Sequence, residues 1–153
     1  MPVVTPGPQP SGDVNWAAVL DHHASRAPDR PAVVFEGETV TYGEMGARAA
    51  ALAGGLRERG VRRGDVVGIL ALNCPEILET VFAANRLGAV AMPVNWRLAP
   101  QEVRYVLEHS GARALVCDGA MLDLAGRATG GMEGALVRAC VPPAAPAGWT
   151  PLA

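Results

Sequence analysis

Three short apolar runs constrain the fold of this chain more than any other feature. The runs are Val66–Leu70, Ala89–Val94 and Ala114–Cys117, and each is apolar at consecutive rather than alternate positions. Consecutive apolar residues are typical of parallel strands that are covered on both faces. Segments with apolar residues three and four positions apart lie between the runs, and this spacing indicates helices. The alternation predicts an α/β fold with a doubly wound, mostly parallel sheet.

The segment that precedes the first run predicts a helix and then a hairpin. The helix is expected over Trp16–Arg26, and it should end before Pro28 because a residue that precedes proline disfavours helical backbone. Ala32–Phe35 and Thr39–Thr41 are then expected to pair as a short hairpin around Glu36-Gly37-Glu38.

A long helix is expected to begin just after Thr41. Thr41 and Glu44 have the spacing of a capping box, in which the hydroxyl accepts from one free amide and the carboxylate from another. Gly60 is well placed to end this helix. Its apolar stripe consists of Tyr42, Met45, Ala49, Leu52 and Leu56.

The following helices have clear starting residues. Pro75 suits the first position of one helix, with Asn73 or Cys74 as its cap and Gly88 at its end. Pro100 opens the next helix. The apolar face of the first is expected to consist of Leu78, Val81, Phe82 and Leu87, and that of the second of Val103, Val106 and Leu107, with Gly111 near its end.

The remaining pattern gives a weaker helix, a last strand and two proline-rich ends. Met121–Arg127 predicts the helix and Ala135–Val141 the strand. Residues 1–12 are expected to be a flexible tail and residues 142–153 a connector, which leaves residues 13–141 as part of one α/β subdomain.

Composition excludes several classes of protein. The net charge of −2 gives no electrostatic reason to bind nucleic acid. No apolar stretch is long enough to cross a bilayer, and the first residues do not resemble a signal peptide. An arginine cluster is expected to be a solvated helix end rather than a phosphate or membrane site; it comprises Arg57, Arg59, Arg62 and Arg63.

The cysteines and histidines do not predict a metal centre. Cys74, Cys117 and Cys140 form no C-x-x-C pair, so we expect no zinc site and a reduced, cytoplasmic setting. The adjacent His22 and His23 point about 100° apart on a helix and are expected to be exposed. The thiol of Cys74, beside a helix N-terminus, is expected to be a buried or cap-side group rather than a nucleophile.

The chain contains no lysine, and all 13 of its basic residues are arginine. Phosphate loops use a lysine to reach the phosphates of ATP. Thr129-Gly130-Gly131 therefore predicts a surface turn. The turn after the first apolar run, Ala71–Pro75, has no glycine, so binding of a dinucleotide by a Rossmann-type loop is excluded.

Several phrases, in a fixed order, resemble the adenylate-forming, AMP-dependent synthetase and ligase superfamily. Thr41-Tyr42-Gly43-Glu44-Met45 is similar to its T-Y-x-E-L motif, and Gly60–Asp65 to its G-V-x-x-G-D phrase. Arg86–Asn95 is similar to its K-A-G-A-x-x-x-P-L-N motif, with arginine in place of the usual lysine. Glu102–Leu107 and Ser110–Ala112 match the helix that follows, and the phrase at Pro93–Leu98 is closest to acyl-CoA synthetases.

The resemblance implies the N-terminal portion of the large domain of an acyl-CoA ligase. Such an enzyme activates a fatty or related carboxylate with ATP and Mg, forms an acyl adenylate and passes the acyl group to coenzyme A. None of the family's catalytic, cofactor-binding or metal-binding residues maps onto this sequence, so this chain alone is expected to be inactive and to bind none of these cofactors. Asn73, Cys74, Asn95, Trp96 and Arg97 fall at carboxyl ends of expected strands and are candidates for a wall of the substrate channel.

Two other functions remain open. The first is a truncated, non-catalytic α/β domain that binds a protein partner through an uncovered edge or face of its sheet; self-association through such sheet is also expected. The second is a flavodoxin-like or receiver-like signalling domain, which fits the order of elements. It fits the residues poorly, because a receiver needs a lysine and a cluster of aspartates at its strand ends.

Overall fold

The computed structural model describes residues 15–141 and 148–151, so the expected tail at residues 1–12 and most of the expected connector at residues 142–153 lie outside the described residues. In chain order the elements are α1 (Trp16–Arg26), β1 (Pro31–Phe35), β2 (Glu38–Thr41), α2 (Tyr42–Glu58), β3 (Val66–Leu70), α3 (Pro75–Leu87), β4 (Val90–Pro93), α4 (Pro100–His109), β5 (Ala112–Cys117), the 3₁₀ turn η1 (Gly119–Met121), α5 (Leu122–Thr129), β6 (Val137–Cys140) and β7 (Thr150–Pro151).

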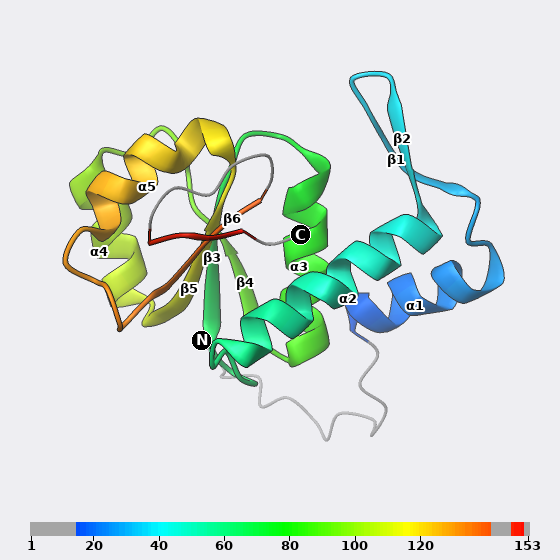
Figure 1. The fold of residues 1–153 in the computed structure, drawn as a ribbon, viewed down its shortest axis with the longest axis horizontal. Helices are drawn as coiled ribbons and strands as arrows, with labels where there is room; N and C mark the ends of the chain where they lie inside the picture. Colours follow the sequence, from blue (N-terminus) through cyan, green and yellow to red (C-terminus); the bar gives the residue numbers. More distant parts are fainter. Residues whose placement is uncertain (1–14, 142–147, 152–153) are drawn as a thin grey trace, which may run out of the picture.

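The main sheet is parallel and has the order β4-β3-β5-β6-β7. Helices α2 and α3 cover one face of it, and α4 and α5 cover the other (Figure 1). This arrangement confirms the predicted α/β class and the doubly wound parallel sheet.

The consecutive apolar runs are explained by two cores, one on each face of the sheet. Val67, Ala114 and Val116 pack beneath α2 and α3, whereas the alternate residues Leu115 and Cys117 pack beneath α4 and α5. Successive side chains of a strand point to opposite faces, so a strand covered on both sides must be apolar at every position.

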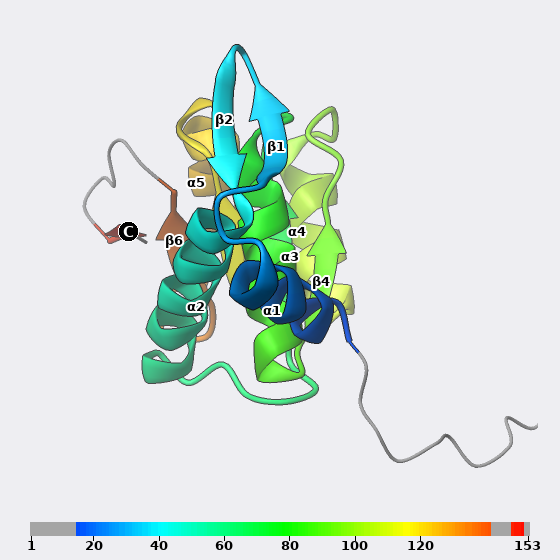
Figure 2. The ribbon, with the colours of Figure 1, turned by 90° about the vertical axis from the view of Figure 1, so that its right-hand side faces the viewer.

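A smaller third core joins α1 to the hairpin. Figure 2 shows α1 lying across α2 and α3, with the β1–β2 hairpin rising beside the N-terminal end of α2. Leu20 of α1 packs with Val40 of β2 and with Met45 and Ala49 of α2. The hairpin forms its own two-stranded antiparallel sheet, so α1 and the hairpin extend the molecule beyond the three-layer core.

The predicted capping box is present at the start of α2. The amide of Glu44 donates to the Thr41 hydroxyl at 3.2 Å, and the amide of Thr41 donates to a carboxylate oxygen of Glu44 at 2.8 Å. The hydrogen bonds lower the pKa of Glu44 from its ordinary value, because they favour the charged carboxylate. The two bonds together satisfy amides that a helix otherwise leaves unpaired.

Thr41→Ala is expected to destabilise the fold by about 0.5–2 kcal/mol, the usual effect of losing an N-cap side chain. The midpoint of denaturant unfolding measures this change. Ser25→Ala is the matched control, since the Ser25 hydroxyl only donates to the carbonyl of His22 on the exposed side of α1. A midpoint for Thr41→Ala equal to that of the control would contradict a stabilising cap.

The expected apolar face of α3 is correct only in part: Leu87 packs against the core beneath α2 and α3 and Phe82 against the third core, but neither is fully buried. The buried positions are Glu79, Thr80, Ala83 and Ala84, whereas the side chain of Leu78 is 41% exposed. Helix α3 lies between the sheet, α2 and α1, so its centre meets neighbours on several sides. Small residues at the centre permit this close approach, and the larger side chains pack toward the periphery.

The ends of α3 and α5 agree with the sequence in part. Cys74, one of the two expected cap residues, occupies the cap position of α3 and makes no side-chain capping bond. Gly130 and Gly131 form an exposed turn, as predicted for Thr129-Gly130-Gly131, but Thr129 is the buried last residue of α5, and its hydroxyl donates to the carbonyl of Ala125. Strand β7 was not predicted; it pairs with β6 through only two residues.

Candidate functional site

The connections of the sheet diverge at the carboxyl ends of β3 and β5, and we call this point of divergence the crevice. Strand β3 leads into α3 on one face, whereas its neighbour β5 leads into α5 on the other face (Figure 1). In open α/β sheets, ligands bind at the carboxyl ends of strands where the connections diverge in this way. This edge is therefore the candidate functional site.

Asp118 joins the two sides of the crevice. It follows β5, and its carboxylate accepts from the amide of Leu72 at 2.7 Å in the loop after β3. Its other oxygen accepts from the amide of Met121 at 2.9 Å and so caps η1. Asp118 was not among the residues predicted from the sequence; the available signal was an aspartate directly after an apolar run and directly before Gly119.

Asn73 and Cys74 lie in the loop between the carboxyl end of β3 and the start of α3. Asn73 is exposed and Cys74 is half-buried. Both line a pocket of about 240 Å³ between the N-terminal turn of α3 and the hairpin strand β1. The other residues that line it are apolar: Val33, Phe35, Pro75, Ile77 and Leu78.

The Cys74 thiol is not poised for nucleophilic attack. Burial, followed by its hydrogen bond with Glu76, raises the pKa of Cys74 to about 11. The nearby helix N-terminus does not reverse this effect. At neutral pH the thiol is protonated, and only the thiolate is a good nucleophile. The prediction of a cap-side thiol rather than a nucleophile is consistent with this direction.

Asn95, Trp96 and Arg97 lie in the exposed loop after β4, and none of them lines the pocket of Asn73 and Cys74. The amide of Arg97 donates to the Asn95 side chain at 3.0 Å. The Arg97 guanidinium lies 4.1 Å from the centre of the Trp96 ring, in a cation–π contact. The five predicted residues therefore form two separate groups.

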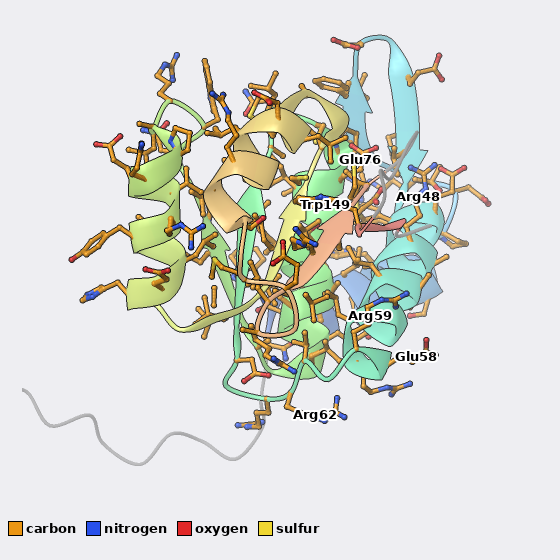
Figure 3. All side chains as sticks on the ribbon, turned by 60° about the vertical axis from the view of Figure 1, so that its left-hand side comes forward. Arg48, Glu58, Arg59, Arg62, Glu76 and Trp149 are labelled. Atoms are coloured by element: carbon orange, nitrogen blue, oxygen red, sulfur yellow. The ribbon has the colours of Figure 1, made fainter. Side chains whose placement is uncertain are left out.

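An ion pair between helices lies near the same end of the molecule. Arg48 of α2 donates to Glu79 of α3 at 3.3 Å, and the Glu79 carboxylate is buried. Burial raises the pKa of Glu79, and Arg48 opposes this shift. Figure 3 shows Arg48 and Glu76 together at this end, whereas Arg59 and Arg62 lie at the other end of α2.

The arginine cluster is a helix end, as predicted. The guanidinium of Arg59 donates to the carbonyl of Gly55 at 2.8 Å, and that of Arg62 donates to the carbonyl of Arg57 at 2.6 Å. These bonds satisfy carbonyls in the last turn of α2, where positive charge is favoured. The cluster lies away from the crevice, so it supplies no charge there (Figure 3).

Within residues 15–141 and 148–151, no group of three or more histidine, cysteine, aspartate or glutamate residues is arranged to hold a metal ion. The crevice has no lysine, because the sequence contains none. None of the described helices is long and apolar enough to cross a membrane.

The parallel sheet, with helices on both of its faces, defines a doubly wound α/β domain. The sequence profile of the family described as "AMP-binding enzyme" matches residues 20–144, and the chain belongs to this family. This assignment confirms the family resemblance carried by the motifs between Thr41 and Ala112.

Individual relatives support the same assignment. Over 93 residues, or 61% of this chain, it is 45% identical to feruloyl-CoA synthase from Amycolatopsis sp., of which the match covers 19%. A benzoate CoA ligase from Burkholderia xenovorans superposes with a TM-score of 0.78 at 27% identity, covering 86% of this chain and 27% of that one. A fatty acyl CoA synthetase from Mycobacterium tuberculosis gives a TM-score of 0.73 at 27% identity, covering 88% and 26%. The chain thus spans about a quarter or less of each of these proteins.

Proposed function

We propose that this chain supplies the N-terminal scaffold of a cytoplasmic acyl-CoA ligase, which activates a carboxylate through an acyl adenylate and transfers it to coenzyme A. The observation that carries the proposal is the family match over residues 20–144. The relatives act, by their names, on feruloyl, benzoate and fatty acyl groups. We therefore propose an aryl or fatty carboxylate as the substrate of the complete enzyme.

The proposed role of the described residues is structural with respect to the chemistry. The crevice holds Asn73 and Cys74 on one side and Asp118 on the other, and the adjoining pocket is mostly apolar. Such a surface suits the wall of a channel for an acyl or aryl group. The high pKa of the Cys74 thiol argues against a covalent intermediate at this position.

We expect the 153-residue chain alone not to adenylate carboxylates. The chain has no lysine, and its described residues include no group of metal ligands, so the transferring phosphates lack their main electrostatic stabilisation. The measurement is exchange of radioactive pyrophosphate into ATP in the presence of benzoate, ferulate or a fatty acid, with a complete acyl-CoA ligase as the positive control. Carboxylate-dependent exchange by the purified chain would show that it is a complete catalyst.

The alternative is a non-catalytic domain that associates through its sheet. In the described part of the chain, no strand pairs with the outer edge of β4, and Val90 on this strand is 54% exposed. Val90 and Val94 donate their amides toward β3, so the alternate residues Ala91 and Pro93 face outward. Because proline has no amide hydrogen, Pro93 cannot donate to a further strand. Only a short part of the β4 edge is therefore open to pairing.

We expect weak self-association of the isolated chain through the β4 edge. Light scattering at micromolar concentration should detect it. Val90→Lys should suppress it, because a charged residue on an edge strand opposes pairing with another chain. Tyr105→Lys is the control, since Tyr105 is 63% exposed on α4. A wild-type monomer that unfolds cooperatively would rule out this association.

A further inference from the structure

Helices α1, α2 and α3 and the root of the hairpin lie next to one another (Figure 2). Residues from all of them line a second pocket. Its volume is about 200 Å³. Val33 and Leu78 line both this pocket and the Asn73–Cys74 pocket, so the two pockets are neighbours. The proposed channel wall rests on the Asn73–Cys74 pocket and not on this one.

The pocket has a rigid apolar floor. Leu20 of α1 and Met45 of α2 contribute to its lining, and they are only 2% and 1% exposed. Both belong to the third core, against which Phe82 of α3 also packs. Because these side chains are fixed by packing on several elements, the cavity is largely preformed, as small-molecule sites usually are.

Aromatic rings distinguish this pocket from an ordinary gap between helices. Trp16, His23, Tyr42 and Phe82 all line it. Such rings favour another aromatic ring through edge-to-face and offset-stacked contacts. The thioether of Met45 adds a favourable contact with an aromatic edge. A saturated ring of the same size would be stabilised only by the burial of its apolar surface.

Two residues with polar groups line the pocket side by side. The ring centres of His23 and Tyr42 lie 5.0 Å apart, so an imidazole and a phenol ring lie next to each other in the lining. Both groups can donate or accept a hydrogen bond. The remaining wall offers no charged side chain, which favours a neutral ligand with one polar substituent over a carboxylate.

The size of the pocket limits the ligand to one ring or a small fused pair. In another protein, an apolar cavity of about 150 Å³ binds benzene. A pocket of about 200 Å³ therefore has room for one substituted ring. The Trp16 side chain, 67% exposed at the mouth, is positioned to contact the outer face of such a ring.

We propose that this pocket is a binding site for a small neutral aromatic molecule with one hydroxyl or amine substituent, held between the Trp16 and Phe82 rings and hydrogen-bonded at the His23–Tyr42 wall. Its chemical class is that of a phenol. Binding requires no ligase chemistry, so the outcome of the pyrophosphate-exchange test does not bear on it.

Titration of the chain with phenol, followed by NMR, tests the site. Saturable shifts are expected at the Trp16 indole N–H and the Met45 methyl group, with a dissociation constant on the order of 1 mM for so small a ligand. Cyclohexanol has the same ring size and hydroxyl without the aromatic ring, and it should bind several-fold more weakly.

Two variants and a control locate the binding. Ala32→Phe introduces a ring from β1 into the pocket and should weaken phenol binding by roughly tenfold or more. Trp16→Ala should weaken it by a smaller factor. Tyr105→Ala, which removes an exposed aromatic ring on α4, should leave it unchanged.

Shifts that grow linearly with phenol, or that are equal at Trp16 and the exposed Trp96, would overturn the proposal. Equal affinity for cyclohexanol would overturn the aromatic selectivity. If Ala32→Phe does not fold, Trp16→Ala provides the test. An unchanged affinity for phenol in this folded variant would exclude binding in the pocket beside α1.

Discussion

Leu107→Ala is expected to destabilise the fold by about 2–5 kcal/mol, one of the two largest effects predicted for a single substitution in this chain. Leu107 of α4 is fully buried beneath its helix, together with Leu115 of β5. Its Cδ2 atom lies so close to the sheet that a β-carbon at Gly68 would be 2.9 Å from it. The leucine therefore fills the space that Gly68 leaves open in β3.

The absence of a side chain at Gly68 explains why the cavity should persist. Neighbouring side chains can partly close a cavity when they are able to move, but a glycine directly beneath it has no side chain to contribute. The free energy of unfolding from urea denaturation measures the loss. Leu72→Ala is the control, because Leu72 is 38% exposed and its truncation should cost below about 1 kcal/mol.

A double-mutant cycle sharpens this prediction. Gly68→Ala alone should destabilise the protein by about 1–3 kcal/mol, because the new methyl group crowds Leu107 and Leu115. In the Leu107→Ala background the same change should be neutral or stabilising, since it fills the cavity. Additive effects of the two substitutions would show that the residues are not coupled.

The predicted elements agree best with the structure where local chemistry decides them. The capping box at Thr41 and Glu44, the proline at the start of α3 and the left-handed Gly88 at its end each have a local cause. Gly88 has a φ of 69°, a backbone conformation that glycine adopts without strain. The run Val66–Leu70 was predicted with its observed bounds, since both faces of β3 are covered.

The phase of α3 and strand β7 depend on tertiary contacts that the sequence does not reveal. The apolar pattern of α3 places Leu78 and Phe82 on one face. Both side chains line the pocket between α1, α2, α3 and the hairpin rather than the main core. A glutamate such as Glu79 is expected at the surface from its sequence alone. Its burial depends on its partner Arg48, which lies 31 positions earlier in the chain. Thr150–Pro151 is too short to give a strand pattern.

The candidate site was predictable only in part. The expected strand bounds placed Asn73 and Cys74 after the carboxyl end of β3, where they lie, and the rule that ligands bind at such ends makes them candidates. The same rule gave equal weight to Asn95–Arg97, because the order of strands, which sets where the connections diverge, was not known. Asp118 was missed because its bond to Leu72 spans 46 positions in the sequence.

Asp118→Ala is expected to destabilise the fold by about 2 kcal/mol and to loosen the candidate site. The substitution removes two charge-assisted hydrogen bonds, one from the amide of Leu72 and one from the amide of Met121. The first bond holds the loop that carries Asn73 and Cys74, and the second caps η1. Asp123→Ala is the matched control: its carboxylate is 82% exposed in an i,i+4 pair with Arg127, and such pairs contribute about 0.3–0.5 kcal/mol.

Hydrogen exchange separates the two consequences of losing the Asp118 carboxylate. Asp118→Ala should accelerate exchange at the Leu72 amide far more than at the amides of β3, because only the loop loses its acceptor. Asp118→Asn should be intermediate, since asparagine is also a good N-cap but carries no charge. Exchange at Leu72 that is unchanged in Asp118→Ala would show that the loop is held by its own backbone, and that Asp118 acts only as a cap of η1.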